Sequence, residues 1–267
     1  MRQLYNYAPG PVAYYKFDEG AGGSVTDSSG NSNTGTWSGE SPRWAAGKIG
    51  RAGSFKTATS QVTLTANPLA NAGPNPFTIS FWLKLDSLAP ASVYRAFIEN
   101  RNLGTNDSGY SIFLDGYSSS KIVLKIGDGS GSNSLSSATA PATGVWQHIT
   151  YVRNADGMYL YINGILNNST ANGGTRNIST AAIPTIGKYS STVPFDGLMD
   201  EVKIYNYART PDQIMEDMQG RAGPVSVNAV SVAGKGTVGY WKFDEGSGTT
   251  AKDGSENGNN GDRKSVV

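Results

Sequence analysis

Short apolar or alternating runs, separated by Gly, Pro, Asn and Ser, recur along most of the chain. Runs of this kind predict β-strands. One segment, 210–219, is predicted to be a helix, because Thr210 can cap it and Pro211 suits its first turn. Many strands and one short C-terminal helix indicate an all-β protein, a two-sheet antiparallel sandwich or jelly roll. The strands are expected at 12–17, 61–64, 77–85, 94–100, 110–114, 122–126, 146–153, 158–162, 185–187 and 198–205.

An internal repeat divides the chain. The segment 12–20 (VAYYKFDEG) returns as 238–246 (VGYWKFDEG), 226 positions later. We therefore predict a complete module over 1–220, a linker over 221–236 rich in small residues, and the truncated start of a second, homologous repeat over 237–267. Because the second copy resembles the opening strand, we hypothesise that it pairs with a sheet edge of its own module or of another molecule. The latter pairing gives a strand-exchanged homo-oligomer.

Charge and composition exclude several classes of function. Lys and Arg number 22 and Asp and Glu 21, a net charge of +1, which disfavours binding to nucleic acid. No apolar run approaches the roughly 18 residues of a membrane span, so membrane insertion is not expected. The absence of Cys and the single His148 exclude disulfides, thiolate metal sites and multi-histidine zinc sites. Any metal should be oxygen-ligated, which favours Ca²⁺.

Several motifs resemble those of a known family. The strings YKFDEG at 15–20 and DSSGNSNTGT at 27–36 resemble the opening of bacterial laminin-G-like modules, which are concanavalin A-like jelly rolls. The resemblance implies a jelly-roll fold over about 12–219 and a glycan-binding or adhesion module of an extracellular or cell-surface bacterial repeat protein. Its partner would be a glycan or another cell-surface ligand. Further motifs follow in the family's order at 47–50, 77–84, 146–152, 161–164 and 195–206.

A calcium site is the first candidate for chemistry. Asp27, Asn31 and Asn33 lie in a turn dense in oxygen ligands, and Asp200 and Glu201 lie in a late strand. The resemblance implies that the first and last strands are neighbours, which would bring Asp27 to Asp200, with the ion tying the two ends of the domain together. The alternative is that the turn is a pair of Asx turns, in which side chains satisfy backbone donors.

A sugar-binding surface is the second candidate. Glycan sites combine aromatic rings with polar groups on loops of a rigid scaffold. Tyr110, Asp115, Tyr117 and Tyr189 fit that composition. The alternative is that these tyrosines only fill strands and rims of the sandwich.

Catalysis is the third candidate, and the sequence does not favour it. The Glu-x-Asp-x-x-Glu pattern of concanavalin-like glycanases is absent. Asp200 and Glu201 would point to opposite faces of a strand unless a bulge intervenes. His148, the only imidazole, occupies a strand position that suits a structural role. A metal-dependent glycoside or phosphoester hydrolase that uses carboxylates near the calcium site, and a structural spacer repeat, remain as alternatives to a binding module.

Overall fold

The chain forms two compact units, 1–224 and 225–267. The computed structural model describes residues 8–39, 41, 43–57, 59–102, 108–188, 195–220, 250–251 and 260–262, with only the backbone of Asn102 and Asp262. No helix among these residues is long and apolar enough to cross a membrane.

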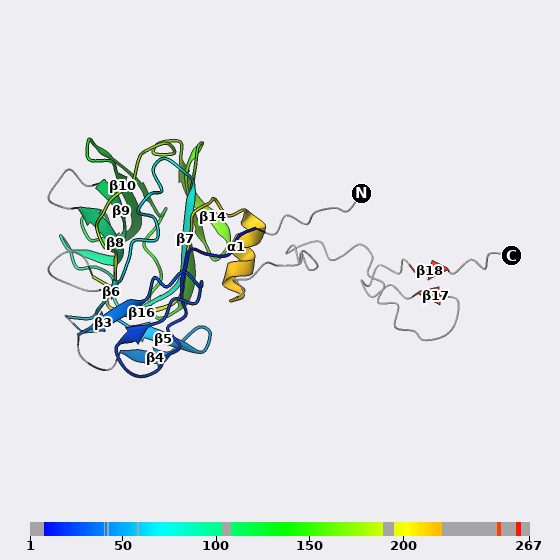
Figure 1. Ribbon diagram of the computed structural model, residues 1–267, viewed down its shortest axis with the longest axis horizontal. Coiled ribbons are helices and arrows are strands. Elements are labelled where there is room, and N and C mark those ends of the chain that lie inside the picture. The colour runs from blue at the N-terminus through cyan, green and yellow to red at the C-terminus, as the bar shows by residue number, and fades with distance from the viewer. Residues whose placement is uncertain are drawn as a thin grey trace. The chain divides into compact units, whose positions relative to one another are not determined.

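Two antiparallel sheets face each other in the first unit (Figure 1). The first sheet has the order β14-β13-β12-β7-β16-β5-β4, and β1 pairs with β16 beside β5. Its strands are β1 (Ala13–Tyr15), β4 (Trp44–Ala46), β5 (Arg51–Ser54), β7 (Phe77–Leu85), β12 (Trp146–Asn154), β13 (Gly157–Ile162), β14 (Ile165–Thr170) and β16 (Gly197–Tyr205). The second sheet has the order β11-β10-β9-β8-β15-β6-β3-β2. Its strands are β2 (Ser24–Val25), β3 (Gly35–Ser38), β6 (Gln61–Leu64), β8 (Tyr94–Asn102), β9 (Ser108–Asp115), β10 (Lys121–Gly127), β11 (Ser132–Ser136) and β15 (Thr185–Ile186).

The core lies between the two sheets because alternate residues of each strand point inward. On β7 the inward residues are Ile79, Phe81 and Leu83, and on β9 they include Ile112 and Leu114, all at most 2% exposed. The helix α1 (Pro211–Met218) covers the outer face of the first sheet, on the side away from β8, β9 and β10 (Figure 1). The predicted jelly-roll sandwich with one short C-terminal helix is therefore confirmed.

All ten expected strands and the helix are present, and their ends coincide with the predicted ones or differ by at most two residues. Thr210 accepts a hydrogen bond from Gln213 N, and the Gln213 side chain accepts from Thr210 N, a complete capping box. Six further strands among the described residues of this unit were not expected. All six are short, with two to six residues, and β14, with the sequence ILNNST, also lacks a regular apolar pattern. They are β2, β3, β4, β5, β11 and β14.

An aromatic cluster closes the core near the N-terminal strands. The Phe17 ring meets Trp37 and Phe55 edge-on, with ring centroids 6.0 Å apart in both pairs. Gly53 lets these rings approach, since a Cβ there would lie 2.8 Å from Phe17 Cδ1 and 2.9 Å from Phe55 Cε2. The strand β1 and the turn that follows it are thus fixed to the core by their own side chains.

A hairpin is described in the second unit. Its strands are β17 (Thr250–Ala251) and β18 (Gly261–Asp262), with Thr250 opposite Asp262. Ser24 lies opposite Thr36 in the first unit, and both positions are 226 residues earlier, as 250 − 24 = 262 − 36 = 226. The hairpin therefore has the same register as the β2–β3 pair, and the second repeat stays a prediction. The segment 238–246, on which the strand-exchange hypothesis rests, lies outside the described residues.

Candidate functional site

Asp27 is the centre of a hydrogen-bonded turn. Its Oδ1 accepts from the backbone N–H of Tyr14 and Ser29, both at 2.9 Å, and its Oδ2 accepts from Asn33 N at 2.9 Å. Burial acts to raise the pKa of Asp27, but the hydrogen bonds from Ser29, Tyr14 and Asn33 outweigh it and hold the pKa below its ordinary value. The carboxylate thus joins the loop to β1.

The two asparagines of this turn act in the same way. Asn31 Nδ2 and Asn33 Nδ2 donate to the carbonyl oxygen of Val12, at 3.2 and 2.9 Å, and Ser29 Oγ donates to the same oxygen at 3.2 Å. This carbonyl precedes β1. The turn residues therefore satisfy the backbone groups on both sides of Ala13, as expected of Asx turns.

Asp200 and Glu201 lie in a β-bulge of β16. Asp200 pairs with Trp82 and Lys203 with Ser80, so two residues of β16 lie opposite one residue of β7. Glu201 takes a left-handed conformation, with φ of 54°. Both carboxylates are buried, with residue exposures of 0% for Asp200 and 3% for Glu201, as are all nine residues of β16. The bulge removes the expectation that they point to opposite faces.

The two buried carboxylates have different partners. Asp200 Oδ2 accepts from the backbone N–H of Lys48 and Ile49, both at 2.9 Å, whereas its buried Oδ1 has no hydrogen-bond partner. Burial raises the pKa of Asp200 to about 7, and the charge of Glu201 adds to the rise. Glu201 Oε2 accepts from the Tyr14 hydroxyl at 2.6 Å and lies 3.2 Å from Lys203 Nζ.

These contacts do not fit a calcium ion shared by the five predicted ligands. Asp27 bonds to the backbone end of Tyr14 and Glu201 to its hydroxyl end, so a tyrosine side chain separates them. The N–H groups directed at Asp27 and the ammonium group beside Glu201 occupy oxygens that a cation would need. No three Asp, Glu or His side chains in the described ranges gather closely enough to hold a metal. Calcium binding stays a prediction, and the turn interpretation fits the geometry better.

His148 is part of a closed packing arrangement. It is 1% exposed, its ring centroid lies 5.2 Å from that of Trp82, and its Nδ1 lies 3.3 Å from Thr150 Oγ1. Burial, and next the charge of Lys203, lowers its pKa to about 3. The imidazole is neutral at physiological pH and closed to solvent, as a structural residue would be.

Tyr110 lies in the core and cannot stack on a sugar. It is fully buried, and its ring centroid lies 6.0 Å from that of Phe77. Its position follows from strand alternation, since it shares a face of β9 with Ile112 and Leu114. Its assignment to a sugar-binding surface therefore does not fit the structure. Tyr189, assigned to the same surface, lies outside the described residues.

Asp115 and Tyr117 do lie together, at the turn between β9 and β10. Asp115 Oδ1 accepts from Tyr117 N at 2.9 Å, and the Tyr117 side chain is 62% exposed. Its ring lies 4.8 Å from that of Tyr94, which in turn lies 5.1 Å from Phe113. We call Tyr94, Phe113 and Tyr117 the aromatic shelf. Tyr94 was not predicted, although β8 places it directly opposite Asp115.

The backbone around the aromatic shelf is strained. Ser92, Ser119 and Ser120 have φ values of 62°, 60° and 53°, a region that L-residues seldom adopt. Hydrogen bonds hold both loops: Ser120 Oγ donates to Ala89 O, and Ser92 N donates to Gly116 O. Strain of this kind persists where the surrounding structure enforces it and clusters at functional sites. The turn thus presents Tyr117 to solvent on a fixed support.

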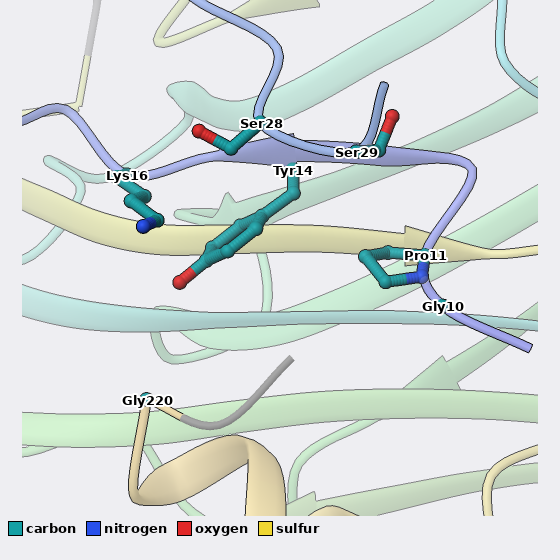
Figure 2. A pocket seen from close by; sticks show the side chains of 7 residues that line it. All are labelled: Gly10, Pro11, Tyr14, Lys16, Ser28, Ser29 and Gly220. Atoms are coloured by element: carbon teal, nitrogen blue, oxygen red, sulfur yellow. The ribbon is translucent and has the colours of Figure 1, made fainter. Parts of the chain in front are cut away.

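A second feature is a surface pocket of about 310 Å³ between β1 and the C-terminal end of α1. Figure 2 shows Tyr14 at its centre, with Pro11 on one flank and Lys16 on the other. None of its residues was assigned to a site from the sequence, although two of them belong to the repeated motif. The lining residues are Gly10, Pro11, Tyr14, Lys16, Ser28, Ser29 and Gly220.

The family model described as the concanavalin A-like lectin/glucanases superfamily matches residues 56–215. This chain belongs to that superfamily. No sequence among the curated proteins matches it.

Several solved structures are similar to this concanavalin A-like module. Domain 4 of AbnA, a GH43 extracellular arabinanase from Geobacillus stearothermophilus, in complex with arabinotriose, is 26% identical with a TM-score of 0.63, covering 79% of this chain and 98% of that one. The binding domain of Paraclostridial Mosquitocidal Protein 1 is 18% identical with a TM-score of 0.64, covering 79% and 52%. The ligand-binding domain of botulinum neurotoxin serotype D, in complex with N-acetylneuraminic acid, is 17% identical with a TM-score of 0.60, covering 80% and 51%.

The likeness to the toxins shows a shared fold, and the chain spans about half the length of those binding domains. The arabinanase domain corresponds over nearly its whole length. Structures with this fold thus include domains that bind carbohydrate, both inside an extracellular enzyme and in toxins.

Proposed function

We propose that this concanavalin A-like module binds a glycan chain at the aromatic shelf and acts outside the cell or at its surface as part of a larger protein. The observation that supports this proposal is the exposure of Tyr117, which is 62%. Its ring packs against Tyr94, and its backbone is held by the hydrogen bond to Asp115. The complex of domain 4 of the arabinanase with arabinotriose supports a neutral oligosaccharide as the first ligand to test.

The chemistry of the shelf suits a sugar ring. The face of a pyranose or furanose ring is apolar at its C–H groups, so it packs on an aromatic face, while its hydroxyls need polar partners at the edge. Tyr117 supplies the aromatic face. Asp115 Oδ1 accepts from the backbone of Tyr117, which leaves the second carboxylate oxygen of Asp115 to accept from a sugar hydroxyl. A rigid support keeps the entropic cost of binding low.

The test is calorimetric titration of the full chain with arabinotriose and with a panel of neutral oligosaccharides. Truncation of a central aromatic anchor costs about 2 kcal/mol or more, so Tyr117→Ala is expected to weaken binding by roughly 30-fold. Ile165→Ala is the matched control, because Ile165 is 74% exposed but lies on β14 of the other sheet.

Equal affinity of the wild type and Tyr117→Ala would refute the assignment of the shelf. Absence of binding across the panel would refute the neutral-glycan ligand and favour the spacer alternative. Release of products from the same oligosaccharides, followed by chromatography, would instead support the hydrolase alternative.

A further inference from the structure

We propose that the pocket between β1 and the end of α1 is a second ligand site, one that accepts a sugar bearing a carboxylate. It lies apart from the aromatic shelf: its residues belong to β1, the Asp27 turn and the end of α1, whereas the shelf belongs to β8, β9 and the β9–β10 turn. A volume of about 310 Å³ is at the small end of the usual range for ligand pockets and suits one sugar unit.

Glu201, the carboxylate that contacts Tyr14 beneath the pocket, is already paired. Glu201 Oε2 receives the Tyr14 hydroxyl and lies 3.2 Å from Lys203 Nζ. Lys203 Nζ also donates to the carbonyl oxygen of Asp217 at 3.0 Å, in the last turn of α1. This contact offsets the partial negative charge at the C-terminal end of the helix. The charge of Glu201, the carboxylate in contact with Tyr14, is therefore compensated by Lys203.

Lys16 carries a positive charge that has no carboxylate partner among the described residues. Its Nζ lies 5.4 Å from the centroid of the Tyr14 ring, and it forms no ion pair with any carboxylate in the described part of the chain. Lys203 lies 5.0 Å from the same centroid, so two ammonium groups flank one ring while only Lys203 has a carboxylate partner. An anionic group that enters the pocket would give Lys16 the missing partner.

The remaining lining suits the body of a sugar. Pro11 supplies an apolar wall beside Tyr14 (Figure 2). Ser28 Oγ makes no hydrogen bond to another described residue, so it can donate to a carboxylate or accept from a hydroxyl. Ser29 Oγ, by contrast, already donates to Val12 O and contacts Asn31. Lys16 and Ser28 thus have the polar side chains of the lining that are open to a ligand.

The test compares D-galacturonate with D-galactose, which differ in the carboxylate, by titration of ¹⁵N-labelled full chain followed by amide shifts. Galacturonate is expected to change the amide chemical shifts of Tyr14, Ser28 and Gly220 in a saturable way. Added salt is expected to weaken the binding of galacturonate. Lys16→Gln is expected to weaken binding about tenfold or more, since it removes a charge-assisted hydrogen bond. Lys84→Gln, on the outer face of β7, is the matched control and should leave affinity unchanged.

Two results would overturn the proposal: equal affinities for galacturonate and galactose, or unchanged affinity in Lys16→Gln. Lack of any saturable shift at the pocket in the folded wild type would do so as well. The Tyr117→Ala variant distinguishes this site from the aromatic shelf. It is expected to bind galacturonate like the wild type but to bind the neutral oligosaccharide roughly 30-fold more weakly.

Discussion

Protonation of His148 is expected to be a major cause of acid unfolding in this protein. The folded protein holds the imidazole neutral, with its pKa lowered from 6.5 to about 3 by burial and by Lys203. In the unfolded chain the same group takes up a proton near pH 6.5. His148 therefore contributes stability that is fully present above pH 6.5 and is lost as the pH falls toward 3.

The magnitude follows from the two pKa values. Between pH 7 and pH 4 the linkage relation gives a loss of about 3 kcal/mol from this one group, of the order of a third of the stability of a typical domain. His148→Gln replaces it with a side chain that does not titrate. The variant loses packing against Trp82 at every pH, but it is expected to lose about 3 kcal/mol less than the wild type on acidification.

Urea unfolding at pH 7, 5.5 and 4, followed by tryptophan fluorescence, measures this difference. Carboxylates titrate in both proteins. The difference between the two proteins in how the free energy of unfolding changes with pH therefore gives the contribution of the histidine. Thr150→Val is a control that perturbs the same contact, Thr150 Oγ1 to His148 Nδ1, while leaving the imidazole in place. The reasoning is refuted if His148→Gln loses as much stability between pH 7 and pH 4 as the wild type.

Two other substitutions test the buried ion pair of Arg209 with Asp217 and the hydrogen-bonded turn at Asp27. Arg209→Met is expected to cost about 3–5 kcal/mol of unfolding free energy, because it leaves the fully buried Asp217 carboxylate, 2.8 Å from Arg209 Nη2, without its cation. Urea unfolding measures the loss of unfolding free energy. The double variant Arg209→Met/Asp217→Asn should recover much of that loss, because it removes the unpaired carboxylate. A cost below about 1 kcal/mol for Arg209→Met would contradict the role of the pair. Asp27→Ala is expected to cost about 2–4 kcal/mol through three lost backbone hydrogen bonds, equally with Ca²⁺ and with EGTA. A calcium-dependent rise in the melting temperature of the wild type, absent in Asp27→Ala, would instead establish the predicted calcium site.

Local patterns predicted most of the fold, since strand and helix signals are encoded within a few residues. The strands β6 and β7 were predicted with the observed ends, and the capped helix within two residues. Strands such as β14 and β11 were missed because they are polar and exposed and form only through pairing with a neighbour. Strand alternation could also have placed Tyr110 in the core, since it lies two positions before Ile112.

The sequence by itself determined the jelly-roll class, because that class depends on the order of local strand and helix signals, and it contains the repeated string of 12–20 at 238–246. The tertiary structure alone decided which distant groups meet. A bulge in β16 turned Glu201 toward Tyr14 and Lys203, β1 brought the Tyr14 N–H group to Asp27, and β8 placed Tyr94 beside Tyr117. The physical reason is that register and bulges follow from the packing of whole sheets, and no local stretch of sequence contains that information.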